Sequence, residues 1–200
     1  AAQKYNIDVW QSEWSMLGDG YSSSEFAGYD AATEMDIALY MSKVIHNDLT
    51  VAGVSSWSYW TSMDMPRWGH KNRFLLIALT PAGGVEGDVE QEGSYQATPT
   101  LWVLGNYSRF IRPGYRRVSL ELNESRSFFG SAWISPENDK IVAVYTNLSE
   151  KGVRLNETHT GWDNEIKEVT TYTTTANKNL KESTVTNGEQ VVLDAESVTT

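Results

Sequence analysis

Cysteine is absent from this chain of 200 residues. The chain therefore forms no disulfide, carries no thiolate nucleophile and holds no zinc ion through cysteine ligands. Basic residues are scarce as well, since 16 Lys and Arg face 26 Asp and Glu, a formal net charge of −10. This balance argues against nucleic acid and anionic membranes as partners, because both attract basic surfaces. No run of about 18 apolar residues occurs, so the sequence predicts no transmembrane helix, and no signal peptide is evident.

Aromatic residues with a polar group are abundant, with 8 Trp and 10 Tyr. Such rings serve as core residues or as platforms for sugars, and composition alone leaves both interpretations open. The 3 His are scattered without the spacing of a metal site. An acidic stretch at residues 86–92 is more typical of a solvated hairpin tip than of a calcium site. We therefore expect neither a metal nor a cofactor.

The first half of the chain alternates strand and helix patterns. Residues 5–13 and 51–60 have the pattern of strands. Between them, residues 31–48 carry apolar side chains at helical spacing, and Asp30 precedes them as a candidate N-cap. A strand, a helix and a strand in this order predict a parallel pair. Two further elements are expected here, a hairpin over residues 74–80 and 94–97 and a helix over residues 100–111.

The second half, from about residue 116, is rich in threonine and valine and poor in helix formers. Its short apolar segments are separated by turn signals, for example at residues 136–139, and this pattern predicts an antiparallel β-sandwich. The expected strands lie at residues 117–122, 128–135, 140–147, 152–156, 166–174, 190–193 and 197–200. We therefore predict two domains, residues 1–115 and 116–200.

The two strand ends of the first domain carry candidate site residues. Glu13 ends the first strand and Trp60 ends the second, and functional groups of parallel α/β folds lie at such C-terminal ends. Alternation places Gln11 and Glu13 on one face, and Ser56, Ser58 and Trp60 on one face of the other strand. If both faces point into one cleft, a carboxylate meets an aromatic platform, as a glycosidase requires. On spacing alone, a surface ion pair at Glu13 and a buried indole ring at Trp60 are the simpler explanation, and they require no function.

Three segments at these positions resemble glycoside hydrolase family 30. They are Trp10–Asp19 (WQSEWSMLGD), Ser55–Asp64 (SSWSYWTSMD) and Leu104–Gly114 (LGNYSRFIRPG). They are similar to the family's seventh strand with its nucleophile, to its eighth strand and to the helix that leaves its barrel. Ser197–Thr200 resembles the family's final strand. The first two segments are nearest the endo-β-1,6-galactanase-like branch.

The resemblance implies an α/β plus all-β fold. The chain is expected to be the C-terminal part of a (β/α)₈ TIM barrel, with strands 7 and 8 and their helices, followed by an antiparallel β-sandwich. The resemblance also implies that Glu13 is the nucleophile of a retaining glycosidase and that Trp60 binds substrate. Within the matching segments, Trp14, Tyr59 and Asp64 are further candidate substrate contacts.

The family's acid/base glutamate lies on the fourth barrel strand, which has no counterpart in these 200 residues. The expected partners are therefore an oligo- or polysaccharide substrate and a missing N-terminal barrel portion, and the chain alone is expected to be inactive. The family implies a secreted, periplasmic or cell-surface location. The alternative hypothesis is a non-catalytic carbohydrate-binding or structural β-sandwich module, which needs aromatic rings but no carboxylate at a strand end.

Overall fold

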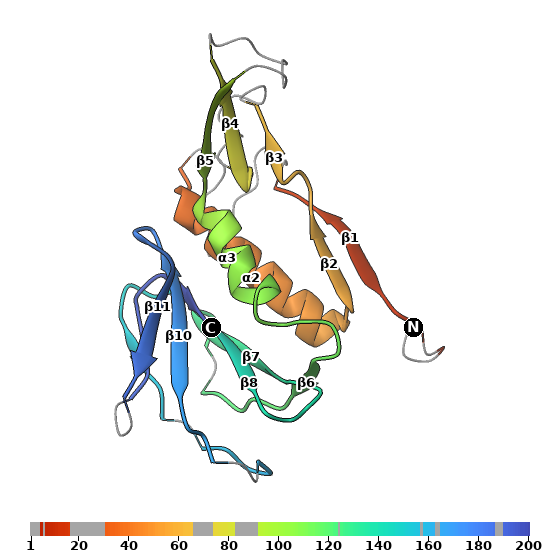
Figure 1. The fold of residues 1–200 in the computed structure, drawn as a ribbon, viewed down its shortest axis with the longest axis vertical. Coiled ribbons are helices and arrows are strands. Elements are labelled where there is room, and N and C mark those ends of the chain that lie inside the picture. Colours follow the sequence, from red (N-terminus) through yellow and green to blue (C-terminus); the bar gives the residue numbers. More distant parts are fainter. Residues whose placement is uncertain are drawn as a thin grey trace. The chain divides into compact units, whose positions relative to one another are not determined.

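The computed structural model describes residues 5, 7–16, 31–65, 74–82, 92–123, 125–156, 158–162, 165–186 and 190–200. The chain divides into two compact units, an N-terminal unit of residues 1–101 and a C-terminal unit of residues 102–200. The division falls inside helix α3 (Pro99–Ser108), and each unit is described here by itself (Figure 1). A domain boundary after residue 115 stays a prediction, since compactness divides the chain earlier.

A parallel strand pair and a helix form the first part of the N-terminal unit. Strand β1 (Trp10–Trp14) is followed by helix α2 (Glu34–Asn47), the π-helix η1 (Asp48–Ala52) and strand β2 (Ser56–Tyr59). β1 and β2 pair in parallel, which confirms the arrangement predicted from the sequence (Figure 1). Both strands are shorter than predicted. Residues 51–52 belong to η1, where Val51 is 82% exposed, and Gly53 ends this turn with a φ of 69°.

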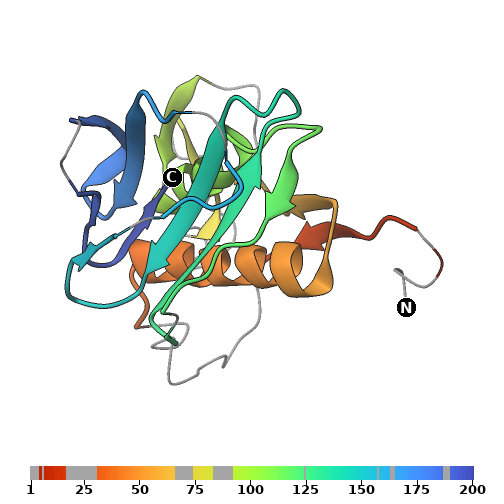
Figure 2. The ribbon, with the colours of Figure 1, turned by 90° about the horizontal axis from the view of Figure 1, so that it is seen from below.

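Helix α2 begins at a capping box. The Thr33 side chain accepts a hydrogen bond from the Asp36 backbone, and the Asp36 carboxylate accepts one from the Thr33 backbone. Thr33 is therefore the N-cap, whereas the predicted cap, Asp30, lies outside the described residues. The helix is continuous (Figure 2). Its buried residues are Met35, Ile37, Ala38, Leu39, Met41, Ser42 and Ile45.

A three-stranded sheet completes the N-terminal unit. Strand β3 (Met63–Asp64) pairs in parallel with β4 (Ile77–Pro81), and β4 pairs antiparallel with β5 (Gly93–Ala97). The predicted hairpin is thus confirmed, although its acidic connection at residues 83–91 lies outside the described residues. Strand β3 was not predicted, because two residues are too few to show an alternating pattern.

The C-terminal unit consists of strands in which every described pair is antiparallel. A six-stranded sheet has the order β11-β10-β13-β8-β7-β6, and β12 pairs with β9. The strands are β6 (Arg116–Val118), β7 (Phe128–Ile134), β8 (Ile141–Asn147), β9 (Val153–Arg154), β10 (Val169–Thr175), β11 (Lys178–Val185), β12 (Val192–Leu193) and β13 (Ser197–Thr199). Leu155 and Leu193 pack with Tyr145 in an apolar cluster, so the β9–β12 pair shares a core with β8.

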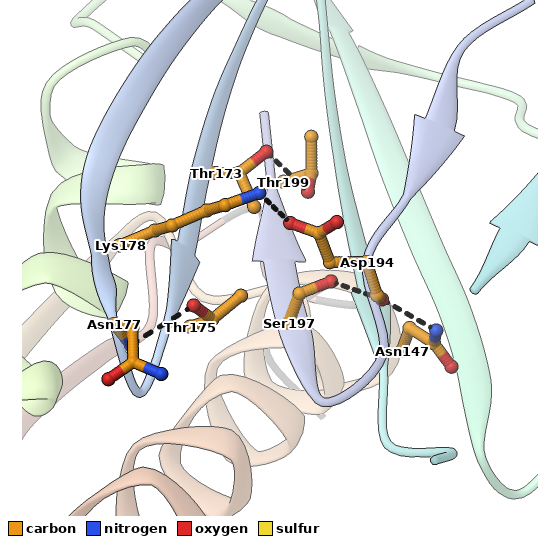
Figure 3. A network of polar contacts seen from close by, with 8 residues as sticks. All are labelled: Asn147, Thr173, Thr175, Asn177, Lys178, Asp194, Ser197 and Thr199. Carbon is orange, nitrogen blue, oxygen red and sulfur yellow. Dashed lines mark hydrogen bonds and ion pairs between the residues drawn. The ribbon is translucent and has the colours of Figure 1, made fainter. Parts of the chain in front are cut away.

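A polar network holds the turn that leads into β13 (Figure 3). The buried Asn147 donates to the backbone oxygens of Lys151 (2.7 Å) and Asp194 (2.8 Å), and Ser197 also donates to Asp194. The Lys178 ammonium lies 2.5 Å from the Asp194 carboxylate. These contacts fix the start of β13 between β8 and β10.

The segment LGNYSRFIRPG joins α3 to the sheet of the C-terminal unit. Asn106 is completely buried, and its amide donates to the Tyr172 carbonyl (2.8 Å) and the Thr200 hydroxyl (2.9 Å). The Arg109 guanidinium lies over the rings of Phe110 and Tyr172, at 5.6 and 5.5 Å from their centroids. Packing within the C-terminal unit therefore explains the residues of this segment. The predicted helix over residues 100–111 ends at Ser108.

Candidate functional site

The register of β1 and β2 shifts by one residue where the candidate nucleophile lies. Gln11 pairs with Trp57, but Trp14 pairs with Tyr59, so β1 contains one residue more than β2 between these pairs. Such a shift is the signature of a β-bulge, in which two residues face one on the partner strand. Ser12 and Glu13 are therefore the two residues of β1 that lie opposite the single residue Ser58 of β2.

The register shift determines on which face of the β1–β2 pair Glu13 lies. Gln11 is in register with Trp57, so it lies opposite the face of Ser56 and Ser58. Strict alternation would keep Glu13 on the Gln11 face, as the sequence analysis expected, and that part of the prediction is wrong. Trp14 shares a face with Tyr59, and its neighbour Glu13 therefore points to the face of Ser58. If the same sequence continued in the register of Gln11 and Trp57, Glu13 would pair with Tyr59 and point toward the side that carries the aromatic rings.

One side of the β1–β2 pair is closed by three packed rings. Trp14 lies 5.8 Å from both Trp57 and Tyr59, measured between ring centroids, and Trp57 lies 6.4 Å from Tyr59. Trp57 donates from its indole nitrogen to the Asp48 carboxylate at 2.9 Å, and the Tyr59 hydroxyl donates to the Phe74 carbonyl. Trp14 also packs against a buried cluster of Met16, Ala32, Ile37 and Phe74. These contacts give Trp14 and Tyr59 a structural role, and their contact with substrate stays a prediction.

The opposite side of the pair is exposed. Glu13, Ser12 and Ser58 are exposed, and Trp10 exposes 70% of its surface. Trp60 follows β2 and is 43% exposed, and its backbone N–H donates to the Trp14 carbonyl at 2.9 Å. The Trp60–Thr61 peptide is cis. The structure thus brings the ends of the two strands together, with Glu13 and Trp60 both accessible to a ligand.

The remaining candidates lie elsewhere. Asp64 is on β3, half-buried, and its carboxylate accepts a hydrogen bond from the Met65 backbone at 2.8 Å. Asp19 and Glu25, two further carboxylates between β1 and α2 in the sequence, lie outside the described residues. Across the described ranges, no group of three or more His, Asp and Glu side chains is arranged to hold a metal ion.

Sequence reasoning did not single out Tyr95 on β5. Its ring is 76% exposed, between the exposed polar residues Ser94 and Gln96. The one signal in the sequence was an aromatic residue at a strand position between polar neighbours, which is also a common pattern in ordinary surface strands.

Comparison with known proteins bears on the same part of the chain. The model of O-glycosyl hydrolase family 30 matches residues 1–70, the stretch that contains β1, α2, β2 and β3. The resemblance to family 30 is confirmed. Both strand ends that carry Glu13 and Trp60 lie inside the family 30 match.

Three solved structures are similar over 99% of the chain. A conserved exported protein from Bacteroides fragilis has 28% sequence identity and a TM-score of 0.78. A family 30 endoxylanase from Clostridium papyrosolvens has 22% identity and a TM-score of 0.63. A family 30 subfamily 8 xylanase from Clostridium acetobutylicum has 19% identity and a TM-score of 0.67.

This chain spans only part of each similar protein, with coverage of 39%, 42% and 43% of their respective lengths. The identities to the two xylanases are low enough that they show a shared fold alone. Among the helices of the described residues, none is long and apolar enough to cross a membrane.

Proposed function

We propose that this chain is the C-terminal portion of a retaining glycosidase that hydrolyses β-linked glycans, with Glu13 as its nucleophile. The observation that carries the proposal is the register shift in β1, which turns Glu13 to the exposed face beside Trp60. The family 30 match over residues 1–70 supports the same class of reaction. A purely structural strand end gives no reason for a carboxylate and an indole ring to be exposed at two neighbouring strand ends.

The chemistry requires a second carboxyl group. In a retaining enzyme the two carboxyl groups lie about 5–5.5 Å apart. The Glu13 carboxylate attacks the anomeric carbon and forms a glycosyl ester, while the second group, as an acid, protonates the leaving oxygen. The second group then takes a proton from water, the water oxygen attacks the anomeric carbon, and Glu13 leaves as a carboxylate. We place this second group in the preceding barrel portion.

The proposed architecture follows from the strand pair. We propose that residues 1–115 supply strands 7 and 8 of a (β/α)₈ barrel, and that residues 116–200 form an antiparallel β-sandwich. A barrel closes its sheet with eight parallel strands, so strands supplied by the preceding portion would pair with the open edges of β1 and β2. The exposed face of Glu13 and Trp60 then lines the barrel mouth. Trp14, Tyr59 and Asp64 are proposed to support or contact substrate, and β-1,6-galactan is the candidate glycan.

The proposed enzyme acts outside the cytoplasm. One similar structure is titled an exported protein, and polysaccharide substrates are too large to enter a cell freely. The proposed partners are an oligo- or polysaccharide and the N-terminal barrel portion.

The proposal is tested by supplying that portion. The 200-residue chain should be inactive on β-1,6-galactan, glucuronoxylan and aryl β-glycosides, and activity should appear when the N-terminal portion is added or fused. In the complete enzyme, Glu13→Gln should lower turnover by several orders of magnitude, because the attacking charge is lost. Asp8→Asn, which removes an exposed carboxylate just before β1, should leave turnover unchanged.

Two further measurements identify the role of Glu13. An activated 2-deoxy-2-fluoro glycoside should leave its sugar attached to the peptide that contains Glu13, as mass spectrometry can determine. Azide should restore activity to Glu13→Ala with inversion at the anomeric carbon. Near wild-type turnover of Glu13→Gln would refute the assignment, and robust activity of the 200-residue chain alone would refute the division of the site. Glycan binding without hydrolysis by the complete protein would favour the binding-module hypothesis.

A further inference from the structure

The three-stranded sheet of the N-terminal unit has one apolar and one polar face. Strand pairing aligns Met63 with Ile77 and Ala97, and Leu79 with Tyr95, so these five side chains share a face. The other face carries Asp64, Ala78, Thr80, Ser94 and Gln96. The apolar face is open, since Tyr95 is 76% exposed and Met63 is 52% exposed. Exposed apolar area of this kind is typical of a binding surface.

This face begins close to the proposed catalytic site along the chain. The three-stranded sheet lies beyond the C-terminal ends of β1 and β2, and β3 follows β2 directly (Figure 1). Three peptide steps separate Trp60 from Met63, so their Cα atoms lie at most about 11 Å apart. A ligand held at Glu13 and Trp60 can therefore extend onto the sheet.

Hydrogen bonds fix the end of β5 to the buried segment that precedes β4. Thr98, which follows β5, is 1% exposed, and its hydroxyl donates to the carbonyls of Leu75 and Leu76 at 2.8 and 3.2 Å. Its backbone N–H donates to Leu76 as well, at 3.0 Å. Phe74, Leu75 and Leu76 are all buried. A platform supported in this way can hold an aromatic ring in one position, which lowers the entropic cost of binding.

The net negative charge of the N-terminal unit favours uncharged sugars over acidic sugars as ligands. Residues 1–101 contain 13 acidic and 5 basic residues, so they carry most of the net charge of −10. Among the described residues of this unit, Glu13 at the end of β1 and Glu92 directly before β5 are exposed carboxylates. The net negative charge of this unit repels uronic acids over about 10 Å at 0.1 M ionic strength, and farther at lower salt, and it leaves uncharged sugars unaffected.

We propose that Tyr95 and Met63 form a second sugar platform, which extends the proposed site and selects an uncharged glycan chain. A flat ring and a thioether present an apolar surface to the C–H face of a pyranose, and the face lacks a basic group that could attract a carboxylated sugar. The inference rests on the proposed glycosidase function. It adds a binding surface beyond the two strand ends, and it makes Tyr95 a specificity-determining residue for long substrates.

The test uses the complete enzyme and compares a long with a short substrate. Tyr95→Ala should lower the ratio of kcat/KM for a β-1,6-linked galactohexaose over an aryl β-galactoside by about two- to tenfold, mainly through KM. Tyr95→Phe, which keeps the ring, should retain the ratio. Gln96→Ala is the matched control, since Gln96 is the adjacent exposed residue on the opposite face.

Charge is tested in parallel. The wild-type enzyme should cleave uncharged galactan faster than glucuronoxylan at low ionic strength, and added salt should reduce the difference. Equal loss on long and short substrates in Tyr95→Ala, with a lowered unfolding temperature, would show that the face is covered by protein and would overturn the inference. A preference for glucuronoxylan would also overturn it while leaving the proposed glycosidase intact. A complete enzyme that is inactive on every glycan would overturn both proposals.

Discussion

Replacement of Asn106 by alanine should destabilise the C-terminal unit more than any exposed substitution. The Asn106 side chain makes three hydrogen bonds inside a fully buried site, to the Tyr172 carbonyl, the Thr200 hydroxyl and the Thr174 hydroxyl. Two of the partners keep another bond in the variant. Tyr172 still accepts from the Thr200 backbone, and the Thr200 hydroxyl still donates to the residue 106 carbonyl.

The third partner, the Thr174 hydroxyl, determines how much stability the variant loses. The Thr174 hydroxyl is 0% exposed and donates at 2.7 Å to Asn106, so the variant leaves this buried donor without an acceptor. Three lost bonds at about 1 kcal/mol each, one of which leaves a buried donor unsatisfied, give a loss of at least about 3 kcal/mol in the free energy of unfolding. For a chain of this size that corresponds to a fall of roughly 6–12 °C in Tm.

Urea and thermal unfolding followed by circular dichroism measure this loss, and hydrogen exchange at the Tyr172 and Thr200 amides localises it. Asn123→Ala, at an exposed site in the same unit, should change stability by no more than about 0.5 kcal/mol. Thr174→Val removes the orphaned hydroxyl, so the double variant should be less destabilised than the sum of the two single variants. A loss below about 1 kcal/mol in Asn106→Ala would refute the reasoning.

Two further predictions concern exposed and packed side chains. Trp57→Ala should lower the free energy of unfolding by roughly 3–5 kcal/mol in denaturant titrations, because it removes a ring from the cluster with Trp14 and Tyr59. Trp60→Ala should instead lower kcat/KM of the complete enzyme more than it lowers stability. If the two variants show each other's effects, the strand faces are assigned the wrong way round. Lys178→Met should cost less than about 1 kcal/mol despite the 2.5 Å contact with Asp194, since both side chains are at least 40% exposed, and a larger loss in 0.5–1 M salt would contradict this.

The sequence predicted those elements whose side-chain pattern is set by burial on one side. Helix α2 and the β7–β8 hairpin have strong periodicity and clear boundary signals, and both form close to the predicted ranges. Strand β11 was missed because it is an edge strand of the sheet, and the sequence KNLKESTV is polar on both faces. An edge strand is held by backbone hydrogen bonds, which leave no hydrophobic pattern to read.

The candidate site was predicted in outline, and its geometry was not. Glu13 and Trp60 were found through strand ends and family segments, which are visible in one dimension. The face of Gln11 was wrong because alternation assumes an uninterrupted ladder, and no residue type marks the extra position at Ser12 and Glu13. Trp14 and Tyr59 pack under the strands because Phe74, which is distant in sequence, supplies a carbonyl acceptor for Tyr59 and part of the apolar cluster that Trp14 contacts.

The extra residue in β1 also sets which changes to this segment are tolerable. A strand has a period of two residues, so one inserted residue acts on its facing pattern as a single-base insertion acts on a reading frame. Substitutions at Ser12 leave that frame intact, whereas an insertion or deletion there would change how Glu13 pairs with β2. Variant libraries of this strand, and grafts of it into other scaffolds, should therefore vary residue identity at constant length and carry Trp10–Trp14 as one unit.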